Sequence, residues 1–515
     1  MTKKTVVAVG VIIALGAVWT GASWFTGKQV EKHIGEFTDN INSQLKTNYP
    51  NAGLKVSYRD YQRGLFSSHL TYVLQSDGTA SDHQVLDNNQ EVVFNETLYH
   101  GPFPLSQVKH LNLIPSMASV HSELVKTDAV APLFELTKDA PFINAETRVT
   151  YSGDTHSDIH LAAIDFQNPD QNPDQKLNFS GSDLKLFVAR DLSQAHIVGN
   201  IANLATEKKN QLGQNEMLTL QDLALDSTSR KSKFDINVGD ANITLKKLTL
   251  NVENENGLTV NDVNISSENN ADDVNLSGKL GIDVASVVVR DQNLGAVNLK
   301  ASFAGVDGHG LKQFSDAYRA KFQTLMSSPE PITTDEYQQQ MAMVVLHNLP
   351  QLLKGNPQIH IAPLTWKNAK GQSDFNLALD LTDPLQKDHN AITGVSDEEA
   401  LIRQSIKNVD LKLNLPLNML TELFVQTGPK VANDNDKKQI EAMARQQAQL
   451  IAGVGQMSQL TVTKDHAITS SLQYADGTVT FNGRKLTLAE FIAPYISVPA
   501  QDAPQAVPAP APQAQ

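Results

Sequence analysis

An apolar pattern that recurs four times in the middle of the chain restricts the fold more than any other feature. In each copy three aliphatic residues occupy positions i, i+3 and i+5, and the copies begin at Leu220, Leu245, Val260 and Val284. Because a strand places alternate side chains on opposite faces, this pattern fits a strand whose alternation is interrupted once, as at a bulge or bend. The copies lie 25, 15 and 24 residues apart, which is too irregular for a solenoid but suits long strands in an antiparallel meander.

Period-two alternation between turn residues predicts further strands on both sides of these repeats. They lie at 54–58, 65–74, 91–100, 116–126, 141–151, 155–166, 176–182, 183–189 and 194–204, and again at 358–366, 374–381, 409–415, 460–464, 468–474 and 478–481. The Asp476-Gly477 pair is a strong hairpin turn between the last two. The predicted fold is α+β and β-dominated, with a long, curved antiparallel sheet, packed helices and one N-terminal transmembrane helix.

Helical periodicity predicts the elements that pack on this sheet. The segments are 132–137, 311–325, a third that Thr333 or Thr334 caps and that ends at Leu353, and then 397–406, 417–427, 436–457 and 486–495. The second and third form a hairpin, and we place a domain boundary there, between a β-rich region at 50–305 and an α+β region at 306–497. Residues 498–515 are rich in Pro, Ala and Gln, a composition typical of a disordered tail.

Residues 5–25 contain no charge and follow Lys3 and Lys4 directly. As a helix this stretch is roughly 31 Å long, which matches the hydrocarbon core of a bilayer. The two lysines before it, with Trp19 and Trp24 near its far end, favour a transmembrane helix whose N-terminus, 1–4, is cytoplasmic. The sequence therefore predicts a single-pass signal anchor with the bulk of the chain exported. A cleaved secretory signal is the alternative.

The small residues of this stretch share one helical face. Gly10, Ala14, Ala17 and Gly21 are spaced four, three and four residues apart, which lets two membrane helices approach closely. Self-association as a homodimer is one interpretation, and the ordinary composition of membrane helices is the other. An amphipathic helix within 26–49 follows, with an apolar stripe at Val30, Ile34, Phe37, Ile41 and Leu45. This stripe is predicted to pack on the folded body or on a second copy.

Composition excludes several classes of function. The chain has no cysteine, which excludes disulfides, a thiolate nucleophile and cysteine-ligated metals. Its formal net charge of −14 argues against a nucleic-acid partner and against broad adhesion to anionic lipid headgroups. With 40% hydrophobic and 19% charged residues the body is predicted to be globular.

Two turn-rich motifs carry a family resemblance. The conspicuous positions are Tyr58, Arg63, Gly64 and Phe66 in the first motif, 58–68, and His100, Gly101 and Pro102 in the second, 100–104. With the short anchor and the stretches 112–119 and 472–477, they resemble the YdgA-like family of Gram-negative inner-membrane-anchored periplasmic proteins. The resemblance implies a cell inner membrane location, a periplasmic body, and a loose association with swarming motility and self-association in the envelope. It implies no chemistry, because the family is essentially uncharacterised.

The motif residues have two interpretations. Gly supplies positive φ and Pro fixes the chain, so both motifs can simply mark tight turns. The functional interpretation places Tyr58, Arg63 and His100 around a common pocket.

The predicted sheet also has two interpretations. A second sheet or helices can cover its apolar face, as in any antiparallel sandwich. Alternatively the face forms an open groove that holds an acyl chain, as in bridge-like lipid carriers of the AsmA type.

No catalytic motif is found: phosphate loop, nucleophile elbow, His-Glu-x-x-His and EF-hand spacings do not occur. His156, Asp158 and His160 share one strand face, but three residues on one strand converge poorly on an ion. We therefore predict no catalytic residue, cofactor or metal site. The favoured function is a non-enzymatic, self-associating envelope protein that binds or carries lipid. The alternatives are an envelope scaffold with protein partners only and, last, a hydrolase of envelope polymers.

Overall fold

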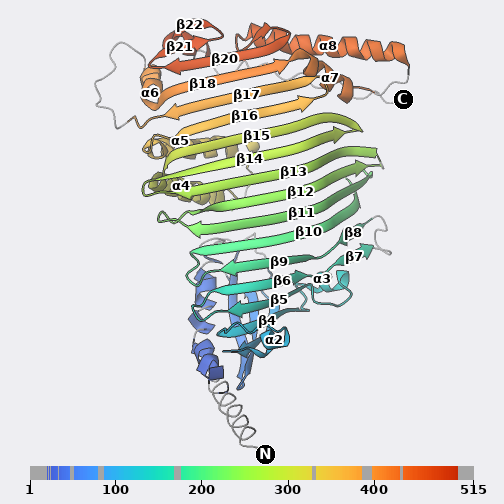
Figure 1. Cartoon of the computed structure of the whole chain (residues 1–515), viewed down its shortest axis with the longest axis vertical. Coiled ribbons are helices and arrows are strands. Elements are labelled where there is room, and N and C mark those ends of the chain that lie inside the picture. The colour runs from blue at the N-terminus through green and yellow to red at the C-terminus, as the bar shows by residue number, and fades with distance from the viewer. Residues whose placement is uncertain are drawn as a thin grey trace, which may run out of the picture.

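The strands follow one another along a single sheet that extends from one end of the molecule to the other (Figure 1). A computed structural model describes residues 20–46 except 21, 24, 33, 37 and 44, together with 52–78, 86–167, 175–210, 212–253, 255–326, 332–384, 397–429 and 433–496. In these residues the sheet has 22 strands, and all of the paired strands are antiparallel.

Strand length divides the sheet into three parts. The N-terminal part contains β1 (Leu54–Arg63), β2 (Ser67–Ser76), β3 (Glu91–His100), β4 (Ala118–Val125), β5 (Ile143–Val149), β6 (Thr155–Leu161), β7 (Ile164–Gln167), β8 (Lys176–Phe179) and β9 (Ser182–Val188). The longest strands are central: β10 (Gln194–Lys209), β11 (Asn215–Lys231), β12 (Asn237–Val252), β13 (Glu255–Ala271), β14 (Asn275–Val289) and β15 (Gln292–Asp307). The C-terminal part contains β16 (Gln358–Asn368), β17 (Gly371–Leu381), β18 (Ile406–Pro416), β19 (Val462–Lys464), β20 (Ala467–Ala475), β21 (Thr478–Phe481) and β22 (Arg484–Thr487).

Strands that are neighbours in sequence are neighbours in the sheet, with two exceptions. β7 and β8 form a hairpin, and β6 pairs with β9 instead of β7. The long strand β10 pairs with β9 over one half and with β8 over the other. At the C-terminal end two helices and β19 separate β18 from its partner β20. β15 pairs with β16, so the sheet continues past the helical hairpin that separates them in sequence.

A bend crosses the central strands along one line. Cross-strand pairing is interrupted at Ala202, Asp222, Lys246 and Asp262, one residue on each of β10 to β13. Asp222 and Asp262 have φ angles of 51° and 48°, which reset the alternation of side chains. The apolar residues before and after the bend therefore share one face. The interruption falls inside the recurring i, i+3, i+5 pattern, so its interpretation as a bent strand is confirmed.

Helices cover the two ends of the sheet. The N-terminal helix, within residues 20–46, buries Val30 and Ile34 against Leu70, Leu98 and Ala118, so the predicted packing of this stripe on the body is confirmed. The short helices α2 (Leu105–Lys109) and α3 (Ala131–Leu136) also lie at this end. The C-terminal end carries α6 (Asp397–Ser405), α7 (Leu417–Thr427), α8 (Asp434–Met457) and α9 (Leu488–Ile496).

A helical hairpin joins β15 to β16. It consists of α4 (Gly308–Met326) and α5 (Thr334–Leu353). Thr333 begins α5 with a capping box, in which its side chain accepts from the Glu336 backbone and Glu336 reaches back to the Thr333 backbone. The start of α4 packs through Leu311 on a core of Phe234, Val238 and Leu276 at the ends of the central strands.

The structure corrects the predicted transmembrane helix at 5–25. No helix among the described residues is long and apolar enough to cross a membrane. Of that stretch only Thr20, Ala22, Ser23 and Phe25 are described, of which Ser23 is buried and Phe25 is 56% exposed. The fold class becomes a large antiparallel sheet with few helices. The single-pass signal anchor, the membrane partner, the inner-membrane location and the N-in topology that relied on this helix are not supported.

Candidate functional site: an uncovered aliphatic face

Cross-strand register lines up the aliphatic side chains of successive central strands on one face. Four adjacent rows cross the strands, two on each side of the bend. The first two are Leu184, Gly199, Leu225, Ile243, Ile265, Ile282 and Leu299, then Ile201, Leu223, Leu245, Val263, Val284, Val297 and Trp366. The rows beyond the bend are Leu204, Leu220, Leu248, Val260 and Val287, then Leu218, Leu250, Leu258 and Val289. We call this surface the aliphatic face.

The aliphatic face is covered at its ends and open in its middle. Beneath the N-terminal helix, Leu70 is 3% exposed. On the open part and its continuation onto β16, the side chains of Leu218, Leu280, Ile359 and Leu364 are 36 to 37% exposed. The only buried apolar cluster on β12 to β14 that the structure describes is the one around Phe234, at the strand ends. The α4–α5 hairpin lies on this side of the sheet over one end of the strands, where Leu311 of α4 packs on the core that contains Leu276 (Figure 1). Away from the hairpin, no buried apolar cluster is described over the middle of the four rows, although their composition is that of a protein core.

The opposite face of the same strands has the character of a solvent-exposed surface. Ion pairs link neighbouring strands there: Lys246 Nζ lies 2.6 Å from Asp262 Oδ1, and Lys279 Nζ lies 3.1 Å from Glu268 Oε2. Such alternation of apolar and charged faces is typical of an antiparallel sheet with one wet side. The aliphatic face is thus the apolar side of the sheet, the side suited to contact with an apolar partner.

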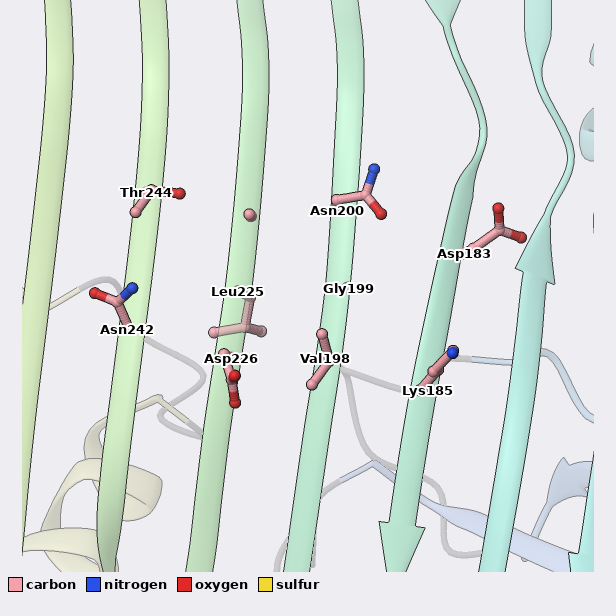
Figure 2. A pocket seen from close by; sticks show the side chains of 10 residues that line it. Asp183, Lys185, Val198, Gly199, Asn200, Leu225, Asp226, Asn242 and Thr244 are labelled. Carbon is pink, nitrogen blue, oxygen red and sulfur yellow. The ribbon is translucent and has the colours of Figure 1, made fainter.

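A shallow hollow of about 290 Å³ lies on the polar face (Figure 2). Its side chains come from β9, β10, β11 and β12, and the small side chain of Ala224 leaves the space open. Two carboxylates, those of Asp183 and Asp226, border it. Each is exposed and each pairs with a histidine at 2.8 Å, His160 and His196 respectively. The hollow is a solvated depression between these histidine–aspartate pairs, and it offers no enclosed space for a reaction.

The motif residues near β1 and β3 gather at the seat of the N-terminal helix. His100 is buried, with Nδ1 3.2 Å from the Leu65 carbonyl oxygen and Nε2 2.8 Å from Ser68 Oγ. Burial lowers the pKa of His100, so the ring is neutral. A carbonyl only accepts, so Nδ1 carries the proton and the Ser68 hydroxyl donates to Nε2. Because Ser68 is fully buried as well, this pair resembles a serine–histidine dyad in composition but is closed to substrate.

The helix docks directly on these residues. A Cβ at Gly27 would lie 2.5 Å from the His100 ring, so Gly27 permits the contact. Thr26 Oγ1 donates to the Gly101 carbonyl oxygen at 3.2 Å, and Arg63 Nη1 donates to Glu31 Oε2 at 3.2 Å. The two motifs therefore form a receptor for the N-terminal helix.

The structure separates the residues that the functional interpretation placed in one pocket. Arg63 and His100 come together at the helix seat. Tyr58 lies five residues before Arg63 on β1, roughly 16 Å along the strand, and is exposed. Phe66 contributes through its backbone, whose carbonyl oxygen accepts from the His100 amide at 2.8 Å. Gly64 donates its amide to the Ser67 carbonyl oxygen in the turn between β1 and β2, at 2.7 Å.

Sequence reasoning missed one acidic residue on the apolar side of the sheet. Glu96 pairs across the strands with Leu70 and Ser122, is 7% exposed, and accepts from Ser122 Oγ at 2.5 Å. Burial raises the pKa of Glu96 to about 7. The sequence of β3 could have revealed this position, because Glu96 alternates in step with Val92, Phe94 and Leu98 and therefore lies on the same face of the strand.

The remaining candidate positions give no site. The His156 ring packs on Phe187 with 5.0 Å between ring centroids, and His160 pairs with Asp183. Among the residues that the structure describes, no group of three or more His, Cys, Asp or Glu side chains could hold a metal ion. The flanks and small-residue face of the expected anchor lie outside the described residues: Lys3, Lys4, Gly10, Ala14, Ala17, Trp19, Gly21 and Trp24.

Comparison with known proteins identifies relatives along the whole chain. The profile of a family described as "Bacterial protein of unknown function (DUF945)" matches residues 1–489. Protein YdgA of Escherichia coli K12 is 36% identical over 510 residues, which covers 98% of this chain and 99% of the relative. The uncharacterized protein YihF of the same organism is 25% identical over 499 residues, covering 96% and 98%. An uncharacterized protein of Haemophilus influenzae is 25% identical over 327 residues, covering 60% and 84%. No solved structure matches.

Proposed function

The chain belongs to the DUF945 family of bacterial proteins of unknown function, in agreement with the YdgA-like resemblance of its motifs, and from this premise we propose that it is a non-enzymatic protein that binds the acyl chains of lipids. The observation that carries the proposal is the aliphatic face, which is continuous over the central strands and open to solvent. Nothing in the family description points to a catalytic activity.

The dimensions of the face suit a long chain better than a compact ligand. From β9 to β16 neighbouring strands are about 4.8 Å apart, so the face extends for about 34 Å across them. A bilayer's hydrocarbon core is about 30 Å thick and contains two layers of chains, so one chain spans about 15 Å. More than one acyl chain therefore fits end to end on this face.

The chemistry of the face also favours an acyl chain. Pockets for compact ligands add a few polar groups that fix orientation. The four rows contain only aliphatic side chains, Gly199 and the indole of Trp366. A chain of about 16 methylenes that buries half of its surface here gains about 6 kcal/mol, before the cost of its lost freedom. The face thus recognises length and hydrophobicity and leaves the head group in water.

A charge in the middle of the aliphatic face tests the proposal. We expect Val263→Asp to weaken the binding of a fluorescent fatty acid at least about tenfold, because a carboxylate placed there must lose water when a chain lies over it. The matched control is Gln221→Glu, which puts the same charge on an exposed position of the opposite face, on β11. Binding is measured by fluorescence titration of the purified chain, and native mass spectrometry counts bound chains.

Val263 is only half-buried and Gln221 is exposed, so both variants are expected to unfold at nearly the wild-type temperature. Equal affinity of wild type and both variants would contradict the proposal. So would a wild-type protein that binds no fatty acid, the result expected from a scaffold with protein partners only.

A further inference from the structure

Helix α8 presents its large apolar side chains to solvent and its small ones to the protein. The buried positions are Ile440, Ala444, Ala448 and Ala452, of which the last two pack against Leu420 of α7. The exposed positions include Met443, Leu450, Val454 and Met457, and the exposed fractions of Leu450 and Met457 are 67% and 85%. Leu460 and Val462, just past the helix, are exposed too. This arrangement is the reverse of an ordinary surface helix, and it indicates a partner.

The exposed residues form a seam in which the two methionines are placed symmetrically about Leu450. At about 100° per residue, Met443, Leu450, Val454 and Met457 lie within about 60° of one another around the helix axis. Met443 and Met457 each lie seven residues from Leu450. If two copies of α8 pack antiparallel about Leu450, each Met443 meets a Met457, and Leu450 meets its own counterpart.

The charges along α8 support the same arrangement. All charged residues of the helix fall within 434–445, and none occurs between 446 and 463. In an antiparallel pair the charged half of each helix lies along the uncharged half of the other. A parallel pair would bring like charges together at Lys437, Lys438, Glu441 and Arg445, which is unfavourable, all the more between two copies of net charge −14.

The seam fits a protein surface better than a lipid surface. Helices that lie in a membrane interface carry Trp, Phe or Leu on the apolar face and are rich in Lys or Arg on the polar face. Residues 446–463 contain no aromatic and no basic residue. In addition, α8 lies at the end of the molecule opposite the N-terminal helix, where nothing in the described chain overlies the seam (Figure 1).

We propose that α8 is a homodimer contact, in which two copies of the chain pack their helices antiparallel through Met443, Leu450, Val454 and Met457. The helices overlap over residues 443–457, about 22 Å. A contact of this length belongs to the small interfaces, below about 1,200 Å² in total, so we expect a reversible dimer of about micromolar affinity. The inference is independent of the proposed acyl-chain binding.

The natural absence of cysteine permits a direct test, because an introduced thiol is the only one in the chain. We expect mild oxidation to link Leu450→Cys into a covalent dimer, since only residues whose Cα atoms approach within about 7 Å form a disulfide. Gln449→Cys, exposed but off the seam, is the matched control and stays monomeric. Met443→Cys and Met457→Cys each stay monomeric alone and form a mixed dimer when combined.

A second measurement does not depend on disulfide geometry. Sedimentation velocity of the full chain over a range of concentrations is expected to show a dimer that Leu450→Glu abolishes and Gln449→Glu preserves. The proposal is overturned if the wild type is monomeric at all concentrations, or if Met443→Cys links to itself as readily as Leu450→Cys. It is also overturned if the wild type forms no dimer but binds neutral phosphatidylcholine vesicles, and Leu450→Glu abolishes that binding. A lipid surface would then occupy the seam.

Discussion

We expect Gly101→Ala to lower the free energy of unfolding by about 3 kcal/mol or more, because no space exists for a methyl group at this position. A Cβ at Gly101 would lie 1.9 Å from the Ser116 carbonyl oxygen and 2.8 Å from that of Met117. Both obstacles are backbone atoms, and the Gly101 amide already donates to the Met117 oxygen at 2.8 Å. The substitution must therefore displace the start of β4 or the turn that carries His100, and the N-terminal helix loses part of its seat.

Urea denaturation of the full chain measures this effect. The control is Gly35→Ala in the N-terminal helix, where a new Cβ meets nothing within 4 Å. Alanine favours a helix over glycine by up to about 1 kcal/mol, so Gly35→Ala should be neutral or stabilising. Equal midpoints for the two variants would show that the packing at Gly101 has been misread. An N-terminal helix that resists proteolysis equally in wild type and Gly101→Ala would argue against its dependence on this turn.

The second large effect is a gain in stability from Glu96→Gln at alkaline pH. The pKa of Glu96 is raised by burial to about 7 in the folded chain, against an ordinary value of 4.5. The folded state therefore keeps a proton that the unfolded state releases, and stability falls as pH rises from about 4.5 to about 7. Above pH 7 the full cost of a buried carboxylate is present, about 3 kcal/mol at 1.36 kcal/mol per pKa unit.

Glutamine preserves the shape of the side chain and can still accept from Ser122 Oγ, but it never ionises. We expect Glu96→Gln to raise the free energy of unfolding by about 2 to 3 kcal/mol at pH 8 and to change it little at pH 4.5. Glu123→Gln, which removes an exposed carboxylate from the adjacent strand β4, should show no such pH dependence. If the two variants respond to pH alike, Glu96 is not the group responsible.

Much of the sheet could be predicted because period-two patterns are local. The strand predicted at 91–100 has the same bounds as β3, and the helix predicted to end at Leu353 ends there, with Thr333 rather than Thr334 as its cap. The i, i+3, i+5 pattern predicted an interruption of the alternation in each of the strands that carry it, since only such an interruption keeps the aliphatic side chains on one face. Strand pairing followed from the short connections, which favour antiparallel neighbours.

What covers each face could not be predicted, because alternation records that a face is apolar but not what lies on it. Leu70 and Leu245 have the same local pattern, yet the first is buried by the N-terminal helix and the second belongs to the open rows. The turn interpretation of the His100 motif was incomplete for the same reason. The contact of its ring with Gly27 spans more than 70 residues of sequence, and no periodicity reports it.

Because each central strand pairs with its neighbours in sequence, the length of the sheet can change by the insertion or deletion of a hairpin. Each central strand bonds to the strands that precede and follow it, so a hairpin can be inserted or deleted without altering the register elsewhere. One such event would lengthen or shorten the sheet by two strand spacings, about 10 Å, and would retain the division into an oily and a charged side. The stability of such a sheet is approximately a sum of contributions from adjacent pairs of strands, so the sheet should unfold from its terminal strands inward. The number of central hairpins therefore sets the length of the sheet.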